Sequence, residues 1–106
     1  MAAQVLSPLA GTELVINLSL TIASLHMDEY DFYADFSAGG PGSRVCRVAK
    51  AAMTRVDADN FLAVVDTTGM KPGLLEIEAT ALIPDTRCPD NIRKEVGKIV
   101  TNILLY

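Results

Sequence analysis

Alternation of apolar and polar side chains constrains this chain more than any other feature of its sequence. Between residues 14 and 22 every second residue is a large aliphatic one, from Leu14 to Ile22, and most of the residues between them are polar. A period of two is typical of a β-strand with one buried face, because successive side chains point to opposite faces. A helix would scatter the same residues around its circumference.

The same pattern recurs in two other segments. Residues 29–36 place Tyr30, Phe32 and Phe36 on one side, and residues 74–83 alternate in the same way until Pro84. Proline has no N–H to donate to a neighbouring strand, so it is expected to end the last of these strands. A shorter strand is predicted over residues 61–65, which are mainly apolar.

Two segments support more than one interpretation. Residues 44–56 fit a helical stripe, and they fit a strand less well. Residues 92–106 space Ile92, Val96 and Ile99 as on one helix face, but Gly97 and the high content of Ile, Val and Thr favour a strand. We predict a strand over residues 92–106 and leave residues 44–56 open.

Turn signals separate these segments. Three glycines and a proline over residues 39–43 predict an exposed loop, and residues 57–60 and 70–73 read as turns. Regular strands with this spacing predict an all-β fold of two packed antiparallel sheets. The alternative is an α+β fold, in which one or two helices pack on an antiparallel sheet. A chain of 106 residues is expected to form one domain, residues 1–106, with residues 1–11 as a flexible arm.

Charge and hydropathy exclude several classes of partner. The net charge is -4, with five acids and no Lys or Arg in residues 1–43, which argues against binding to nucleic acid. The longest charge-free interior run, between Glu13 and Asp28, is too short and too polar to span a membrane. No positively charged segment typical of a signal peptide opens the chain. We therefore expect a cytoplasmic or particle-associated protein.

The chain contains two cysteines, Cys46 and Cys88. Two are too few for a disulfide framework or a closed zinc site. We interpret them as free thiols that pack as small apolar residues, although spacing alone leaves a single bridge open.

A longer stretch of the sequence carries a resemblance to a known group of proteins. Residues 65–76, which read VDTTGMKPGLLE, and residues 79–96, which read ATALIPDTRCPDNIRKEV, resemble a family of short β-sandwich proteins from phage and prophage-like regions of gut anaerobes. Residues 27–32 and 53–57 also fit, so the likeness covers about residues 12–106. Cys88 and Asn91 depart from the family pattern, which has phenylalanine and glycine there.

The resemblance implies more about the fold than about the function. The family is similar in outline to the immunoglobulin-like N-terminal domains of phage upper-baseplate proteins. It implies an immunoglobulin-like antiparallel β-sandwich of about seven strands. It also implies that residues 44–51 and 94–105 are strands.

No set of reactive side chains predicts a catalytic, cofactor or metal site. His26 is the only histidine, so any Ser-His-Asp or Cys-His arrangement would depend on it, and a connector residue is the favoured interpretation. Three groups of residues that include acids are interpreted as a charged strand face or as turns. Glu29, Asp31 and Asp35 form the strand face; Asp57, Asp59 and Asn60 form one turn, and Asp85 and Asp90 cap another. We therefore predict no enzyme activity and no cofactor.

The sequence favours protein–protein contact. Leu74 and Leu82 lie on the otherwise polar side of their predicted strand, and Tyr106 follows an apolar terminal segment, so these three residues are candidate interface positions. The predicted partner is another copy of the chain or a neighbouring structural subunit. The alternative function is binding of a small ligand or a glycan, against which stand the absence of Trp and the presence of only Tyr33 among the strand aromatics on the polar side.

Overall fold

Seven strands and three short 3-10 turns make up the described part of the chain. The computed structural model describes residues 13–22 and 24–105, so the predicted N-terminal arm lies outside the described residues. The elements in chain order are β1 (Glu13–Leu18), η1 (Met27–Glu29), β2 (Asp31–Ser37), β3 (Cys46–Ala49), η2 (Lys50–Ala52), β4 (Thr54–Asp57), β5 (Asn60–Asp66), β6 (Gly73–Pro84), η3 (Pro89–Asn91) and β7 (Ile92–Leu105).

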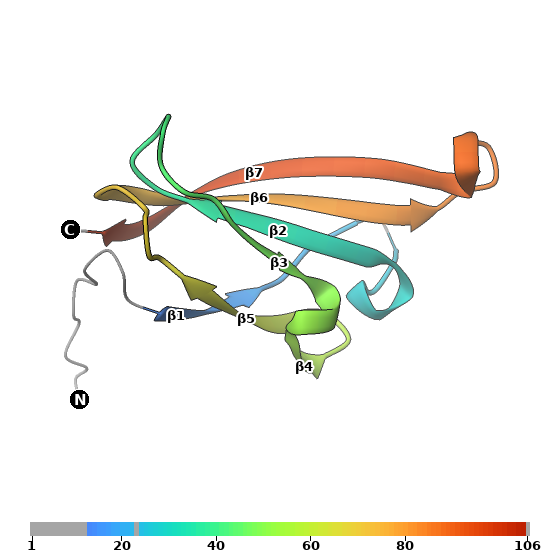
Figure 1. Cartoon of the computed structure of the whole chain (residues 1–106). Coiled ribbons are helices and arrows are strands. Elements are labelled where there is room, and N and C mark those ends of the chain that lie inside the picture. The colour runs from blue at the N-terminus through green and yellow to red at the C-terminus, as the bar shows by residue number, and fades with distance from the viewer. Residues whose placement is uncertain (1–12, 23, 106) are drawn as a thin grey trace.

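The strands form two antiparallel sheets that pack face to face (Figure 1). The smaller sheet has the order β1-β5-β4 and the larger the order β3-β2-β6-β7. The order matches an immunoglobulin sandwich without its first strand A and with an added strand C′: β1, β5 and β4 take the places of strands B, E and D, and β3, β2, β6 and β7 those of C′, C, F and G. The all-β prediction is confirmed. The α+β alternative is wrong for the described residues, because the only helical turns there have three residues each.

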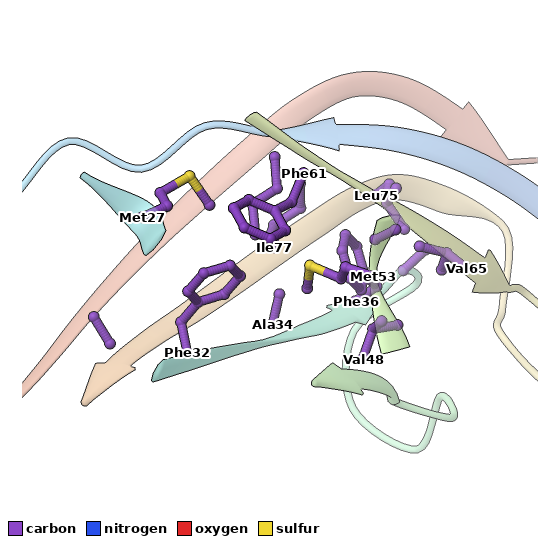
Figure 2. Close-up of a cluster of buried hydrophobic side chains, with 14 of the residues drawn as sticks. Met27, Phe32, Ala34, Phe36, Val48, Met53, Phe61, Val65, Leu75 and Ile77 are labelled. Carbon is purple, nitrogen blue, oxygen red and sulfur yellow. The ribbon is translucent and has the colours of Figure 1, made fainter. Parts of the chain in front are cut away.

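The core lies between the two sheets and is built from the alternating residues of both (Figure 2). Phe32 of β2 meets Phe61 of β5 edge to face, with ring centroids 5.2 Å apart. The two aromatic rings therefore join the larger sheet to the smaller one. Met27, from the turn η1, fills the space next to them and is fully buried.

The first predicted strand is shorter than its alternation suggests. β1 ends at Leu18, and the prediction of a strand over residues 14–22 is wrong beyond that point. Leu20 and Ile22 still pack against the core, but the backbone there leaves the smaller sheet, and Ile22 forms an isolated bridge with Leu25. The alternation between more and less exposed side chains therefore continues after the strand pairing has ended.

Residues 44–56 form neither one helix nor one strand. They divide into β3, the turn η2 and β4, and β4 belongs to the other sheet. Of the segment 44–51 that the resemblance implied to be a strand, only residues 46–49 are one. Lys50 holds the crossing in place, because its Nζ donates to the carbonyl oxygens of Met27 at 3.0 Å and Tyr30 at 2.8 Å.

Most of the remaining predictions of secondary structure are confirmed. Two are displaced: the strand predicted over residues 29–36 begins at Asp31, and the turn predicted over residues 70–73 lies at residues 67–70, where the Met70 N–H donates to the Thr67 carbonyl oxygen at 3.0 Å. Residues 92–105 are one strand, β7, which pairs with β6 from Ile92 opposite Pro84 to Leu105 opposite Gly73. Asp57 accepts hydrogen bonds from the backbone N–H of Asp59 at 2.9 Å and from Asn60 Nδ2 at 2.8 Å, which closes the predicted turn between β4 and β5. Cys46 and Cys88 are free thiols.

The glycine-rich loop joins β2 to β3 and requires a glycine at one position in particular. Gly39 has a positive φ of 80°, and a Cβ there would lie 2.9 Å from the carbonyl carbon of Lys71. Gly40 also has a positive φ, but its Cβ would meet nothing within 4 Å. Of these two glycines, only Gly39 approaches the turn before β6 closely, and Ser43 adds a second contact because its Oγ accepts a hydrogen bond from the Lys71 N–H at 2.9 Å.

Candidate interaction surface

The most unusual surface of the protein is the first half of β7. This strand has 14 residues and forms one edge of the larger sheet, with β6 as its only strand neighbour among the described residues (Figure 1). Most of the side chains described from Ile92 to Ile99 are exposed, whichever face of the sheet they point to. A strand within a sandwich is normally covered on one face.

The inner face of β7 is identified by its pairing with buried residues of β6. Residues directly opposite each other in an antiparallel ladder share a face. Ile99 lies opposite Ile77, and Gly97 lies opposite Ala79. Ile77 is only 5% exposed, whereas Ile99 is 50% exposed. The smaller sheet therefore covers β6 but does not reach across the first half of β7.

A groove runs along this uncovered inner face. It has a volume of about 240 Å³ and is lined mainly by apolar or small residues: Leu20, Thr21, Ile22, Ala79, Ala81, Glu95, Val96, Gly97, Lys98 and Ile99. The small side chains of Ala79 and Ala81 and the absence of one at Gly97 create the hollow. A groove of this volume is below the usual range of roughly 300–1,000 Å³ for small-molecule sites.

The outer face of the same half-strand is also apolar in part. Val96 is 58% exposed and Ile92 is 46% exposed, and both alternate with lysines along β7. Lys98 pairs with Glu76 at 3.0 Å, whereas Lys94 makes no ion pair or hydrogen bond with the described residues. Both faces of this half-strand therefore present exposed aliphatic side chains, and the outer face presents them beside two lysines.

Two of the three predicted interface residues, Leu74 and Leu82, lie on the outer face of β6 but do not form one patch. Leu74 is 46% exposed and lies opposite Leu104, whereas Leu82 is half-buried between Asp31 and Lys94. Eight positions along one strand correspond to roughly 26 Å, so Leu74 and Leu82 lie at opposite ends of β6. Tyr106 lies outside the described residues.

The sequence did not identify the residues that make this surface. Ile92, Val96 and Ile99 appear there as a candidate helix face or as part of a predicted strand. The available signal was the length of the segment, since a 14-residue strand is at least twice as long as any strand of the smaller sheet, the longest of which has 7 residues.

A second hollow of about 530 Å³ lies at the turn between β6 and β7. Two arginines border it, but Asp85 binds both of them, Arg87 at 2.7 Å and Arg93 at 4.0 Å. Hydrogen bonds from the side chain and backbone of Arg87 hold the pKa of Asp85 far below its usual value. Because Asp85 neutralises Arg87 and Glu95 pairs with Arg93 at 3.1 Å, the hollow offers little free positive charge to an anion.

The other acidic groups close local structure. Arg47 binds Asp35 through two nitrogen–oxygen contacts of 2.7 and 3.0 Å, and Glu29 accepts a hydrogen bond from the backbone N–H of His26. Within residues 13–22 and 24–105, no group of three or more His, Cys, Asp or Glu side chains is arranged to hold a metal ion.

His26 lies at the surface next to Asp59. Its Nδ1 is 3.0 Å from each carboxylate oxygen of Asp59, and this hydrogen bond raises the pKa of His26 above its ordinary value. The imidazole is largely exposed, and neither Cys46 nor Cys88 is among its hydrogen-bond partners. His26 thus links the turn η1 to the β4–β5 turn.

Comparisons with known proteins leave the chain without an assigned family. No protein-family model matches it, and neither a curated protein nor a solved structure does. The fold defines the class of protein, an all-β sandwich of two antiparallel sheets. No helix in the described ranges is both long and apolar enough to cross a membrane.

Proposed function

We propose that this chain is a non-catalytic structural or assembly module that acts through protein–protein contacts at the open edge of β7. The observation that carries the proposal is the exposure of Ile99, which lies on the inner face of a sheet whose neighbouring residues are buried. Aliphatic side chains that are half-exposed beside unpaired strand hydrogen-bonding groups favour association.

The edge has the features by which a sheet accepts another strand. Its backbone N–H and C=O groups on one side have no strand neighbour in the described chain. Main-chain pairing at such an edge supplies affinity, and grooves for alternate side chains supply specificity. The groove beside Gly97 and Ile99 is suited to receive such side chains.

The biological setting of the proposal comes from the resemblance to phage and prophage-like sandwich proteins. It supports a tail- or baseplate-associated component whose partner is another copy of the chain or a neighbouring subunit. The sandwich fold and the order of its strands agree with this likeness.

Glycan binding, the second function considered, receives no support from a particular contact. The Arg47 guanidinium carbon lies 4.2 Å from the centre of the Tyr33 ring, so one face of this ring is already covered. The candidate groove holds no aromatic residue. We therefore do not propose this function.

An affinity experiment tests the proposal. The tagged chain is prepared in two ways: purified from its own source together with any partner, and purified alone at high concentration. Its mass is then measured by light scattering after gel filtration. We expect a stable oligomer or a complex of fixed stoichiometry that the Ile99→Lys substitution weakens. Val56→Lys is the matched control, because Val56 is 53% exposed on β4, an edge strand of the other sheet. A monomer without any partner would contradict the proposal.

A further inference from the structure

We infer that residues 2–9 of this chain add a strand to the smaller sheet, antiparallel to β1, and cover the groove beside Gly97. The observations that carry the inference are the unprotected edge of β1 and the groove that lies next to it. The inference goes beyond the proposed function, because it assigns an occupant to the inner side of β7 and leaves the backbone edge of that strand free for a partner.

β1 is an edge strand without the usual protection against pairing. Natural edge strands are blunted by charged residues, bulges or short length. Among the four edge strands of the described chain, β3 carries Arg47, the register of β4 shifts after Arg55, and β7 carries three basic residues. β1 carries no charge after its first residue, Glu13, and its register with β5 is regular. The edge of β1 is therefore the one that most needs a cover.

A strand beside β1 would lie over the groove. The smaller sheet has three strands and the larger has four, and an added strand would extend the smaller sheet by about 4.8 Å on its β1 side. Leu20 and Ile22, which continue the chain after β1, line the groove together with Gly97 of β7. An immunoglobulin sandwich has its first strand at this place, beside the strand that corresponds to β1.

The segment before β1 is long enough to reach the groove. β1 begins at Glu13, and Leu20 follows seven positions later, roughly 23 Å along an extended chain. A hairpin that turns at Gly11 needs about as many residues to return over this distance, and twelve residues precede Glu13. Glycine is favoured in tight hairpin turns, so Gly11 is well placed between the two strands.

The composition of the segment suits a partly buried strand. Residues 1–12 contain no charged side chain, so they can cover an apolar groove without removing a charge from water. Val5 and Leu6 are adjacent, and successive side chains of a strand point to opposite faces. One of them therefore points to the groove in either register, and the other lies on the same outer face as Val15, which is 66% exposed. Pro8 has no N–H to donate, and such a residue is tolerated in a strand that is itself an edge.

Amide exchange in a dilute sample of the full-length chain tests the inference. The β1 amides that point away from β5 are expected to be protected in the wild-type chain. Val5→Asp/Leu6→Asp places a charge at the apolar groove and should speed the exchange of these amides by at least about tenfold. Ala10→Asp/Thr12→Asp adds the same charge at the turn, so it is the control and should change the exchange little.

A second variant blocks the groove from the side of β7. A Cβ added at Gly97 would meet nothing within 4 Å, so the groove has room for the side chain of Gly97→Leu. This side chain takes the place of Val5 or Leu6, and we expect it to speed the exchange of the β1 amides as the charged variant does. Val96→Leu, on the outer face of β7, is the control and should leave the β1 amides protected.

Three results would overturn the inference. The first is fast exchange of the β1 amides in the wild-type chain, and the second is protection that persists in both test variants. The third is protection that develops only as the chain concentration is raised, because the added strand would then come from a second copy. The proposed function is tested separately, since its readouts are the mass of the complex and its weakening by Ile99→Lys.

Discussion

Ile77 and Ile99 lie directly opposite each other on the same face of the β6–β7 ladder, yet only Ile77 is buried. The boundary of the smaller sheet passes between these two side chains. One aliphatic residue therefore contributes to the core of the sandwich, and its neighbour is left for a partner.

The two isoleucines should differ in their contribution to the stability of the monomer. Ile77→Ala removes a buried side chain and is expected to lower the free energy of unfolding by roughly 2–5 kcal/mol. Ile99→Ala is expected to lower it by about 1 kcal/mol or less, because half of this side chain already contacts water. Urea unfolding at low protein concentration measures both values. If both substitutions lowered the free energy of unfolding equally, Ile99 of β7 would be as well covered in solution as Ile77.

Lys50 should stabilise the crossing between the two sheets. Its Nζ donates to the carbonyl oxygens of Met27 and Tyr30. Lys50→Met keeps much of the apolar stem but removes these bonds, so we expect a loss of about 1.5–3 kcal/mol in the free energy of unfolding. Lys94→Met, on the open edge, serves as the control and should have little effect. Comparable losses in both variants would argue against a structural role for Lys50.

The β2–β3 loop should distinguish sharply between two adjacent glycines. Gly40→Ala is expected to cost about 1–2 kcal/mol, because it places a side chain in the left-handed backbone region. Gly39→Ala carries the same penalty and also forces its Cβ against the Lys71 backbone, which adds roughly 1–3 kcal/mol. Thermal unfolding of both variants tests this order. A larger loss for Gly40→Ala would contradict the close approach at Gly39.

Asp85 should make folding stability depend on acid pH. The hydrogen bonds from Arg87 lower the pKa of Asp85 in the folded chain, so the unfolded chain binds this proton more readily. The stabilisation is present above the unfolded pKa of about 3.9 and is lost as the pH falls through the lower folded value. Urea unfolding between pH 2 and 5 should show a flatter pH dependence for Asp85→Asn and Arg87→Gln. If the free energy of unfolding of both variants depended on pH as steeply as that of the wild-type chain, the Asp85–Arg87 pair would not contribute to stability in solution.

The sequence predicts the sandwich because alternation reports directly which face of a strand is buried. It could not locate the end of β1, since Leu20 and Ile22 still pack against the core, half-buried, after the backbone has left the sheet. Residues 44–56 were undecided for a related reason. Their two short strands belong to different sheets, and the contacts of Lys50 with distant carbonyl groups fix the turn between them.

The open edge of β7 could not be predicted from the same pattern. Ile92, Val96 and Ile99 have the composition of buried strand residues, and their exposure depends on how far the other sheet extends. That extent is a property of the whole fold. Leu74 and Leu82 share a face, as the alternation implied, but the length of β6 separates them.

Hydrogen–deuterium exchange of the β7 amides tests the central claim most directly. Every second amide of this strand points away from β6 and should exchange rapidly in a dilute sample if the edge is open. We predict that the exchange of these amides slows as the chain concentration is raised. The exchange rates of the amides of β4, an edge strand of the other sheet, should not change. Exchange in β7 that is fast and independent of concentration, with or without a purified partner, would contradict it.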